Sequence, residues 1–171
     1  MSHSRIFQIS KNKIPKEGYT KANDFSYNHW FLHTVADCVS DDTDRHSDIL
    51  WLSESTPIVL SNDKESFTIS ANSLDKYFGP KYKEMQDVLQ RLTEVGFETF
   101  AGNGDVIGAT RFKTDIFNFR NAVSDERCFY VVNEVIDEEY WAPHPITLCD
   151  FLRRVEPGKT YHFGAVLDYH S

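Results

Sequence analysis

Residues 79–96 read GPKYKEMQDVLQRLTEVG and form the clearest secondary-structure signal in the chain. Proline is favoured in the first turn of a helix, and glycine is favoured just after its last turn. Between Pro80 and Gly96, apolar side chains recur every three or four positions, which is the spacing of one helix face. These side chains are Tyr82, Met85, Val88, Leu89, Leu92 and Val95. The pattern predicts an amphipathic helix over 81–95 with its charged side in solvent.

On the C-terminal side of this helix the apolar period changes to two, which is typical of strands. The run GNGD at 102–105 predicts the turn of a hairpin. Further along, Thr147 and Asp150 have the spacing of a helix N-cap and its acidic third residue, so a short helix is expected there. The expected strands are 97–101, 106–112, 115–120, 127–135 and 160–169.

On the N-terminal side, a first strand is expected at 4–10, where polar and apolar residues alternate. The polar stretch 11–23 is typical of a loop. A helix over 26–39 would gather several apolar side chains on one side, and a separate helical turn is expected at 73–78. The remaining expected elements are strands at 48–53, 56–60 and 66–70, the last two joined as a hairpin.

Consecutive strands with short turns indicate antiparallel pairing. The sequence therefore predicts an α+β fold, with a mostly antiparallel sheet packed by the 81–95 helix and by one or two shorter helices. No internal repeat and no linker rich in Pro, Gly or Ser divides the chain. We expect a single globular domain over 1–171.

Charge and cysteine content narrow the class of protein. The chain has 18 Lys and Arg against 26 Asp and Glu, which gives a formal charge of −8. This sign disfavours direct nucleic-acid binding and suits a basic protein partner. The three cysteines lie far apart without a C-x-x-C pair, and no apolar segment has the length of a signal sequence or a membrane span. These features predict a cytoplasmic protein that does not bind membranes.

An acidic and aromatic cluster follows the strand expected at 127–135. Large aromatic side chains are enriched where proteins bind one another. The favoured hypothesis is a small acidic protein-binding module, such as an inhibitor, immunity-type or adaptor protein, without catalytic activity or cofactor. Its expected partner-binding residues are Glu134, Asp137, Glu138, Glu139, Tyr140 and Trp141.

The alternative hypothesis is a metal-dependent, hydrolase-like enzyme. On the expected helix, His29, His33 and Asp37 are spaced four residues apart, so they would stack on one side and could hold a divalent metal ion. On the expected last strand, Asp168 and His170 share a face, where Asp168 can orient His170 as a general base or His170 can join the metal ligands. The sequence leaves open whether the chain is an enzyme or a binding module, and it leaves the oligomeric state open.

Overall fold

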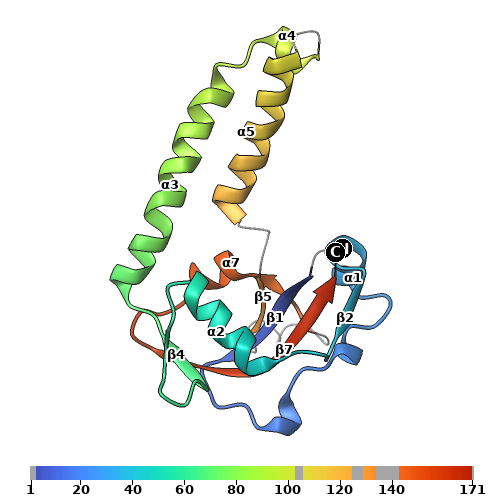
Figure 1. Cartoon of the computed structure of the whole chain (residues 1–171), viewed down its shortest axis with the longest axis vertical. Coiled ribbons are helices and arrows are strands. Elements are labelled where there is room, and N and C mark those ends of the chain that lie inside the picture. Colours follow the sequence, from blue (N-terminus) through green and yellow to red (C-terminus); the bar gives the residue numbers. More distant parts are fainter. Residues whose placement is uncertain (1–2, 103–105, 125–128, 134–142, 171) are drawn as a thin grey trace. The chain divides into compact units, whose positions relative to one another are not determined.

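The computed structural model describes residues 3–102, 106–124, 129–133 and 143–170 (Figure 1). The chain folds into two compact units, one of Met1–Leu74 with Cys128–Ser171 and the other of Asp75–Arg127. Helices and a mixed, mostly antiparallel sheet are both present, so the predicted α+β class is confirmed. The expectation of a single domain over 1–171 stays a prediction.

The first unit is built on a seven-stranded sheet with the order β3-β4-β7-β1-β5-β6, and β2 also pairs with β7. The β1 and β5 strands run parallel, and the other pairs are antiparallel. The strands are β1 (His3–Ser10), β2 (Cys38–Ser40), β3 (Val59–Leu60), β4 (Ser66–Thr68), β5 (Phe129–Asn133), β6 (Ile146–Thr147) and β7 (Thr160–His170).

The helices divide between the two units. The first unit contains α1 (Trp30–Thr34), α2 (Arg45–Ser55), α7 (Leu148–Leu152) and two 3₁₀ turns at Lys16–Gly18 and Ala22–Asp24. The second unit is formed by most of α3 (Ala71–Thr93), by α4 (Phe97–Phe100) and by α5 (Val106–Ser124). No helix within the described ranges combines the length and apolarity that a membrane span needs.

The two faces of the sheet carry different side chains, because alternate residues of a strand point to opposite faces. On one face, Ile6, Leu167 and Tyr169 belong to a buried apolar cluster that includes Phe31 of α1. The opposite face carries Arg5, Phe129 and Asp168, which are aligned by the strand register. The α2 helix contacts this second face, since the ring centroids of Trp51 and Phe129 are 4.8 Å apart.

Several predicted elements of the first unit are confirmed. The strand expected at 4–10 is β1, the hairpin expected within 56–70 is the β3–β4 pair, and the strand expected at 160–169 is β7. The strand expected at 127–135 is β5, although it pairs in parallel with β1. The Thr147 side chain accepts a hydrogen bond from the Asp150 backbone and caps α7, as its spacing predicts.

Two predictions for the first unit are wrong. The helix expected over 26–39 is reduced to α1, because the His29 side chain caps its start and the chain pairs with β7 from Cys38 onward. The strand expected at 48–53 is part of α2, which the Asp44 side chain caps by accepting a hydrogen bond from the Ser47 backbone. The buried Ile49 and Leu52 follow a helical spacing.

In the second unit, the helix expected over 81–95 is confirmed but begins earlier, at Ala71, so it includes the turn expected at 73–78 and Pro80 lies inside it. The strands expected at 97–101, 106–112 and 115–120 are wrong, because these residues form α4 and α5. In α5, Asp115 is buried and accepts hydrogen bonds from Arg91 of α3. This contact joins the two helices.

Candidate metal centre at the end of strand β7

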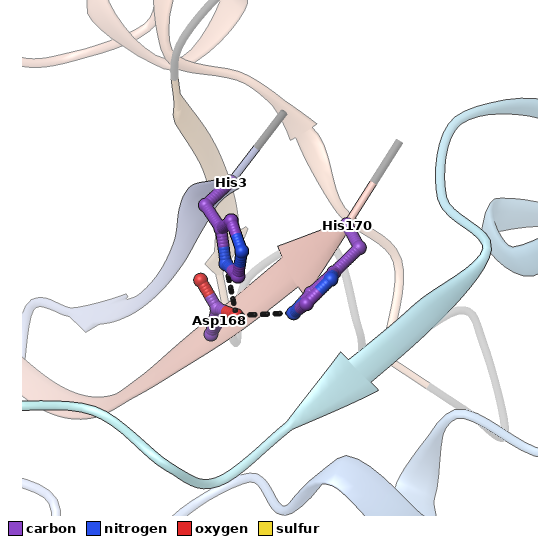
Figure 2. A group of neighbouring side chains, drawn as sticks. All are labelled: His3, Asp168 and His170. Carbon is purple, nitrogen blue, oxygen red and sulfur yellow. Dashed lines mark hydrogen bonds and ion pairs between the residues drawn. The ribbon is translucent and has the colours of Figure 1, made fainter. Parts of the chain in front are cut away.

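Two imidazoles and one carboxylate meet where β1 begins and β7 ends (Figure 2). His3 Nδ1 lies 3.1 Å from Asp168 Oδ2, and His170 Nε2 lies 2.9 Å from the same oxygen. One ligand atom from each of the three residues lies within 4.8 Å of those of the other two. Among the residues that the structure describes, this is the one group of three or more His, Cys, Asp or Glu with that spacing.

The pairing of β1 with β7 places these side chains together. In this antiparallel pair His3 lies opposite His170, and Arg5 lies opposite Asp168. Directly opposed residues share a face of the sheet, as do residues two apart along a strand. The ring centroids of His3 and His170 are accordingly 3.9 Å apart. The cluster therefore follows from the backbone register.

The three side chains differ in exposure in a way that leaves one side of the cluster open. The side chain of Asp168 is 7% exposed, that of His170 is 24% exposed and that of His3 is 57% exposed. The carboxylate thus lies at the base of the cluster and His3 lies at its rim. The cluster is therefore most exposed to solvent at His3.

A second carboxylate and a guanidinium lie behind Asp168. Arg5 Nη1 donates a hydrogen bond to Asp168 Oδ1. Arg5 Nε lies 2.9 Å from Oδ1 of Asp48, which is in the first turn of α2. The two atoms form an ion pair, but the Arg5 Nε–H group does not make a hydrogen bond with any of the described residues. Oδ2 of Asp48 is buried without a hydrogen-bond partner among the described residues. Arg5 is thus held between two buried carboxylates.

Two of the separations within the cluster are compatible with the ligand set of a transition metal ion. Zinc binds imidazole nitrogen and carboxylate oxygen at about 2.0–2.2 Å, so neighbouring ligand atoms of a tetrahedral site lie about 3.3 Å apart. The two nitrogen–oxygen separations of 3.1 and 2.9 Å are close to this value. Two histidines with one carboxylate, and further positions open, form a ligand set that recurs in metalloenzymes.

The structure does not assemble the metal site expected from the first histidine pair. His29 is buried, its Nδ1 accepts a hydrogen bond from the Phe31 backbone and its Nε2 lies 2.6 Å from the Pro143 carbonyl oxygen. His33 is an exposed residue of α1, and Asp37 lies beyond the end of that helix. Among the described residues, His170 is the one member of the expected set that joins the observed cluster.

The expected pairing of Asp168 with His170 is confirmed by their 2.9 Å contact. His3 was not expected, because nothing in its neighbourhood of the sequence marks it as a ligand. Only the β1–β7 register brings it opposite His170. The expected partner-binding residues Glu134, Asp137, Glu138, Glu139, Tyr140 and Trp141 lie outside the described residues. The protein-binding hypothesis therefore stays a prediction.

His144 gives the first unit a testable pH dependence. Burial, and then the nearby His29, lower the pKa of His144 below its usual value of 6.5. The unfolded chain therefore binds a proton more readily, so this residue's contribution to stability is full above pH 6.5 and is lost as the pH falls toward the lowered pKa. We expect His144→Gln to reduce the fall in the thermal unfolding midpoint between about pH 7 and pH 5.

The measurement is circular dichroism melting at both pH values. His46→Gln is the matched control, because His46 is exposed. The same fall for wild type, for His144→Gln and for His46→Gln would contradict the expected role of His144.

No protein-family model, curated protein or solved structure matches this chain.

Proposed function

We propose that His3, Asp168 and His170 bind a divalent transition metal ion. The observation that carries this proposal is the meeting of three ligand atoms within 4.8 Å at the rim of the sheet. Each comes from a residue type that binds such ions, and the open side leaves room for a water molecule or a substrate. This keeps the metal-dependent hypothesis from the sequence but assigns it to a different ligand set.

The charge balance around the cluster supports a cation. Arg5 contributes one positive charge, Asp48 and Asp168 contribute two negative charges, and both carboxylates are buried. Arg5 can pair one of these two negative charges, which leaves one for a further cation to pair. A buried charge of this kind is costly unless it is paired, and a bound divalent ion would pair it.

The chemistry open to such a centre is the activation of water. A zinc ion with three protein ligands lowers the pKa of a bound water molecule to about 7, which yields a nucleophile at neutral pH. The exposed side at His3 would admit a substrate with a hydrolysable bond. We propose a hydrolase-like activity on this basis.

The direct test is metal binding by tag-free protein that has been stripped with a chelator. We expect calorimetry to report one equivalent of Zn²⁺ or Co²⁺ for the wild type. His170→Ala should weaken binding by more than the roughly 10–100-fold cost of losing a group that only orients a ligand. At 100 times the dissociation constant, the ion should stabilise the fold by about 2.7 kcal/mol.

The matched control is His33→Ala, which removes an exposed imidazole outside the cluster. It should bind the ion as the wild type does. Equal affinities for the wild type and for His170→Ala, or no binding by the wild type, would reject the proposal.

A further inference from the structure

We infer that Arg5 is a positioning residue that selects small transition metal ions over calcium, by holding one oxygen of Asp168 away from the metal. The inference rests on the proposed metal binding by His3, Asp168 and His170. It concerns which ion the site takes and how the carboxylate binds it.

The two oxygens of Asp168 have different partners. Oδ2 faces both imidazoles, His3 Nδ1 at 3.1 Å and His170 Nε2 at 2.9 Å. Oδ1 accepts a hydrogen bond from Arg5 Nη1. A metal ion between the imidazoles would therefore meet Oδ2 alone, and Asp168 would bind it through one oxygen.

Arg5 is itself held in place. Its side chain is 20% exposed, and its Nε lies 2.9 Å from Asp48 Oδ1 while its Nη1 contacts Asp168. If the Arg5 guanidinium moved away, the buried carboxylates of Asp48 and Asp168 would face each other without a cation between them, which is unfavourable. Asp48 of α2 thus holds the Arg5 guanidinium in place, and the guanidinium in turn holds the Asp168 carboxylate.

Binding through one oxygen keeps the coordination number low. Zinc accepts four ligands at about 2.0–2.2 Å, whereas calcium takes six to eight oxygen ligands at about 2.3–2.6 Å and often binds carboxylates through both oxygens. A site with two nitrogens and one available carboxylate oxygen suits zinc and gives calcium too few ligands. Freeing Oδ1 would raise the coordination number and reduce this discrimination.

The test is the paired variant Arg5→Met/Asp48→Leu, which removes the guanidinium and its anchoring carboxylate together. Replacing a buried ion pair with apolar side chains is often tolerated, so this variant avoids leaving Asp48 unpaired. In cobalt-loaded protein, the visible absorption of the ion is strong at four-coordination and weak at higher coordination. We expect the wild type to give the strong spectrum and the paired variant to give a spectrum several-fold weaker.

The second readout is selectivity, measured as the ratio of Zn²⁺ to Ca²⁺ affinity. We expect the Zn²⁺ affinity to fall about 10–100-fold in the paired variant, the usual effect of losing a group that orients a ligand, while the Ca²⁺ affinity does not fall, so the ratio falls with it. Lys11→Met/Glu156→Leu is the matched control, because it removes an exposed ion pair and should leave spectrum and ratio unchanged. Arg5→Lys keeps the charge but not the planar fork, and should give values between those of the wild type and the paired variant.

The outcomes separate this inference from the proposed function. Wild type that binds no Co²⁺ would overturn the metal site itself. Wild type that binds Co²⁺, with an unchanged spectrum and ratio in Arg5→Lys and in the paired variant, would overturn the role of Arg5 and leave the metal site standing.

Discussion

Arg5→Ala is expected to lower the free energy of unfolding by about 3–5 kcal/mol, the usual cost of removing one partner from a buried ion pair. Asp48 and Asp168 are both buried, and Arg5 is the cation that contacts both. Without it, two buried carboxylates would lie near each other with no arginine between them. A loss of this size is a large share of the stability of an ordinary domain.

Urea denaturation of metal-free protein is the measurement. Lys11→Ala is the control, because the Lys11–Glu156 pair is about half exposed and solvent-exposed ion pairs contribute little to stability. If Arg5→Ala cost no more than Lys11→Ala, the two carboxylates would not depend on Arg5 for compensation. Saturating Zn²⁺ should return part of the lost stability in Arg5→Ala, because the ion supplies positive charge to the same group.

Gly164→Ala is expected to destabilise the first unit by about 3 kcal/mol through overpacking in β7. A Cβ atom at this position would lie 2.4 Å from Gln8 Oε1 and 2.8 Å from Ile14 Cδ1. Gln8 cannot move aside cheaply, because Oε1 accepts hydrogen bonds from the backbones of Thr20 and Ala165. Displacing it would leave the buried Ala165 backbone N–H unpaired, at a cost of about 1–3 kcal/mol, and would also break the bond from the half-buried Thr20 N–H.

The matched control is Gly79→Ala, since a Cβ atom at Gly79 meets nothing within 4 Å. Gly79 lies in the interior of α3, where alanine is favoured over glycine by roughly 0.5–1 kcal/mol, but it precedes Pro80, whose ring disfavours a helical residue with a Cβ atom before it. These two effects oppose each other, so this control should cost less stability than Gly164→Ala. Thermal and urea unfolding of both variants give the comparison. A Gly164→Ala protein as stable as Gly79→Ala would show that Gln8 and Ile14 can yield.

Elements that are determined by neighbouring residues are predicted correctly from the sequence, whereas the 97–120 region is not. The α7 cap is predicted from neighbouring residues, Thr147 with Asp150, and the last strand from the residues within 160–169. The 97–120 region was predicted wrongly, because short stretches of alternating residues fit a helix as well as a strand. A contact between distant residues, Arg91 with Asp115, accompanies the helical outcome.

The sequence predicts one part of the candidate site, the pair of Asp168 and His170. Asp168 and His170 lie two residues apart on one strand, so their shared face follows from the alternation of side chains alone. His3 joins them through a register between strands 165 positions apart in sequence, and Arg5 and Asp48 join through the same pairing and through α2. The helix expected over 26–39 would place His29, His33 and Asp37 on one side, whereas α1 begins after His29 and ends before Asp37.

The pairing of β1 with β7 also sets an order of folding during synthesis. The β1 strand is made early, but its two neighbours in the sheet, β5 and β7, are made more than a hundred residues later. Contacts between residues so far apart in sequence form slowly, whereas helices form from local contacts. The α3 and α5 helices can therefore form on the ribosome while β1 still awaits a partner. A β1 strand whose Ile6, Phe7 and Ile9 side chains stay exposed in that interval is a segment on which a chaperone would be expected to act.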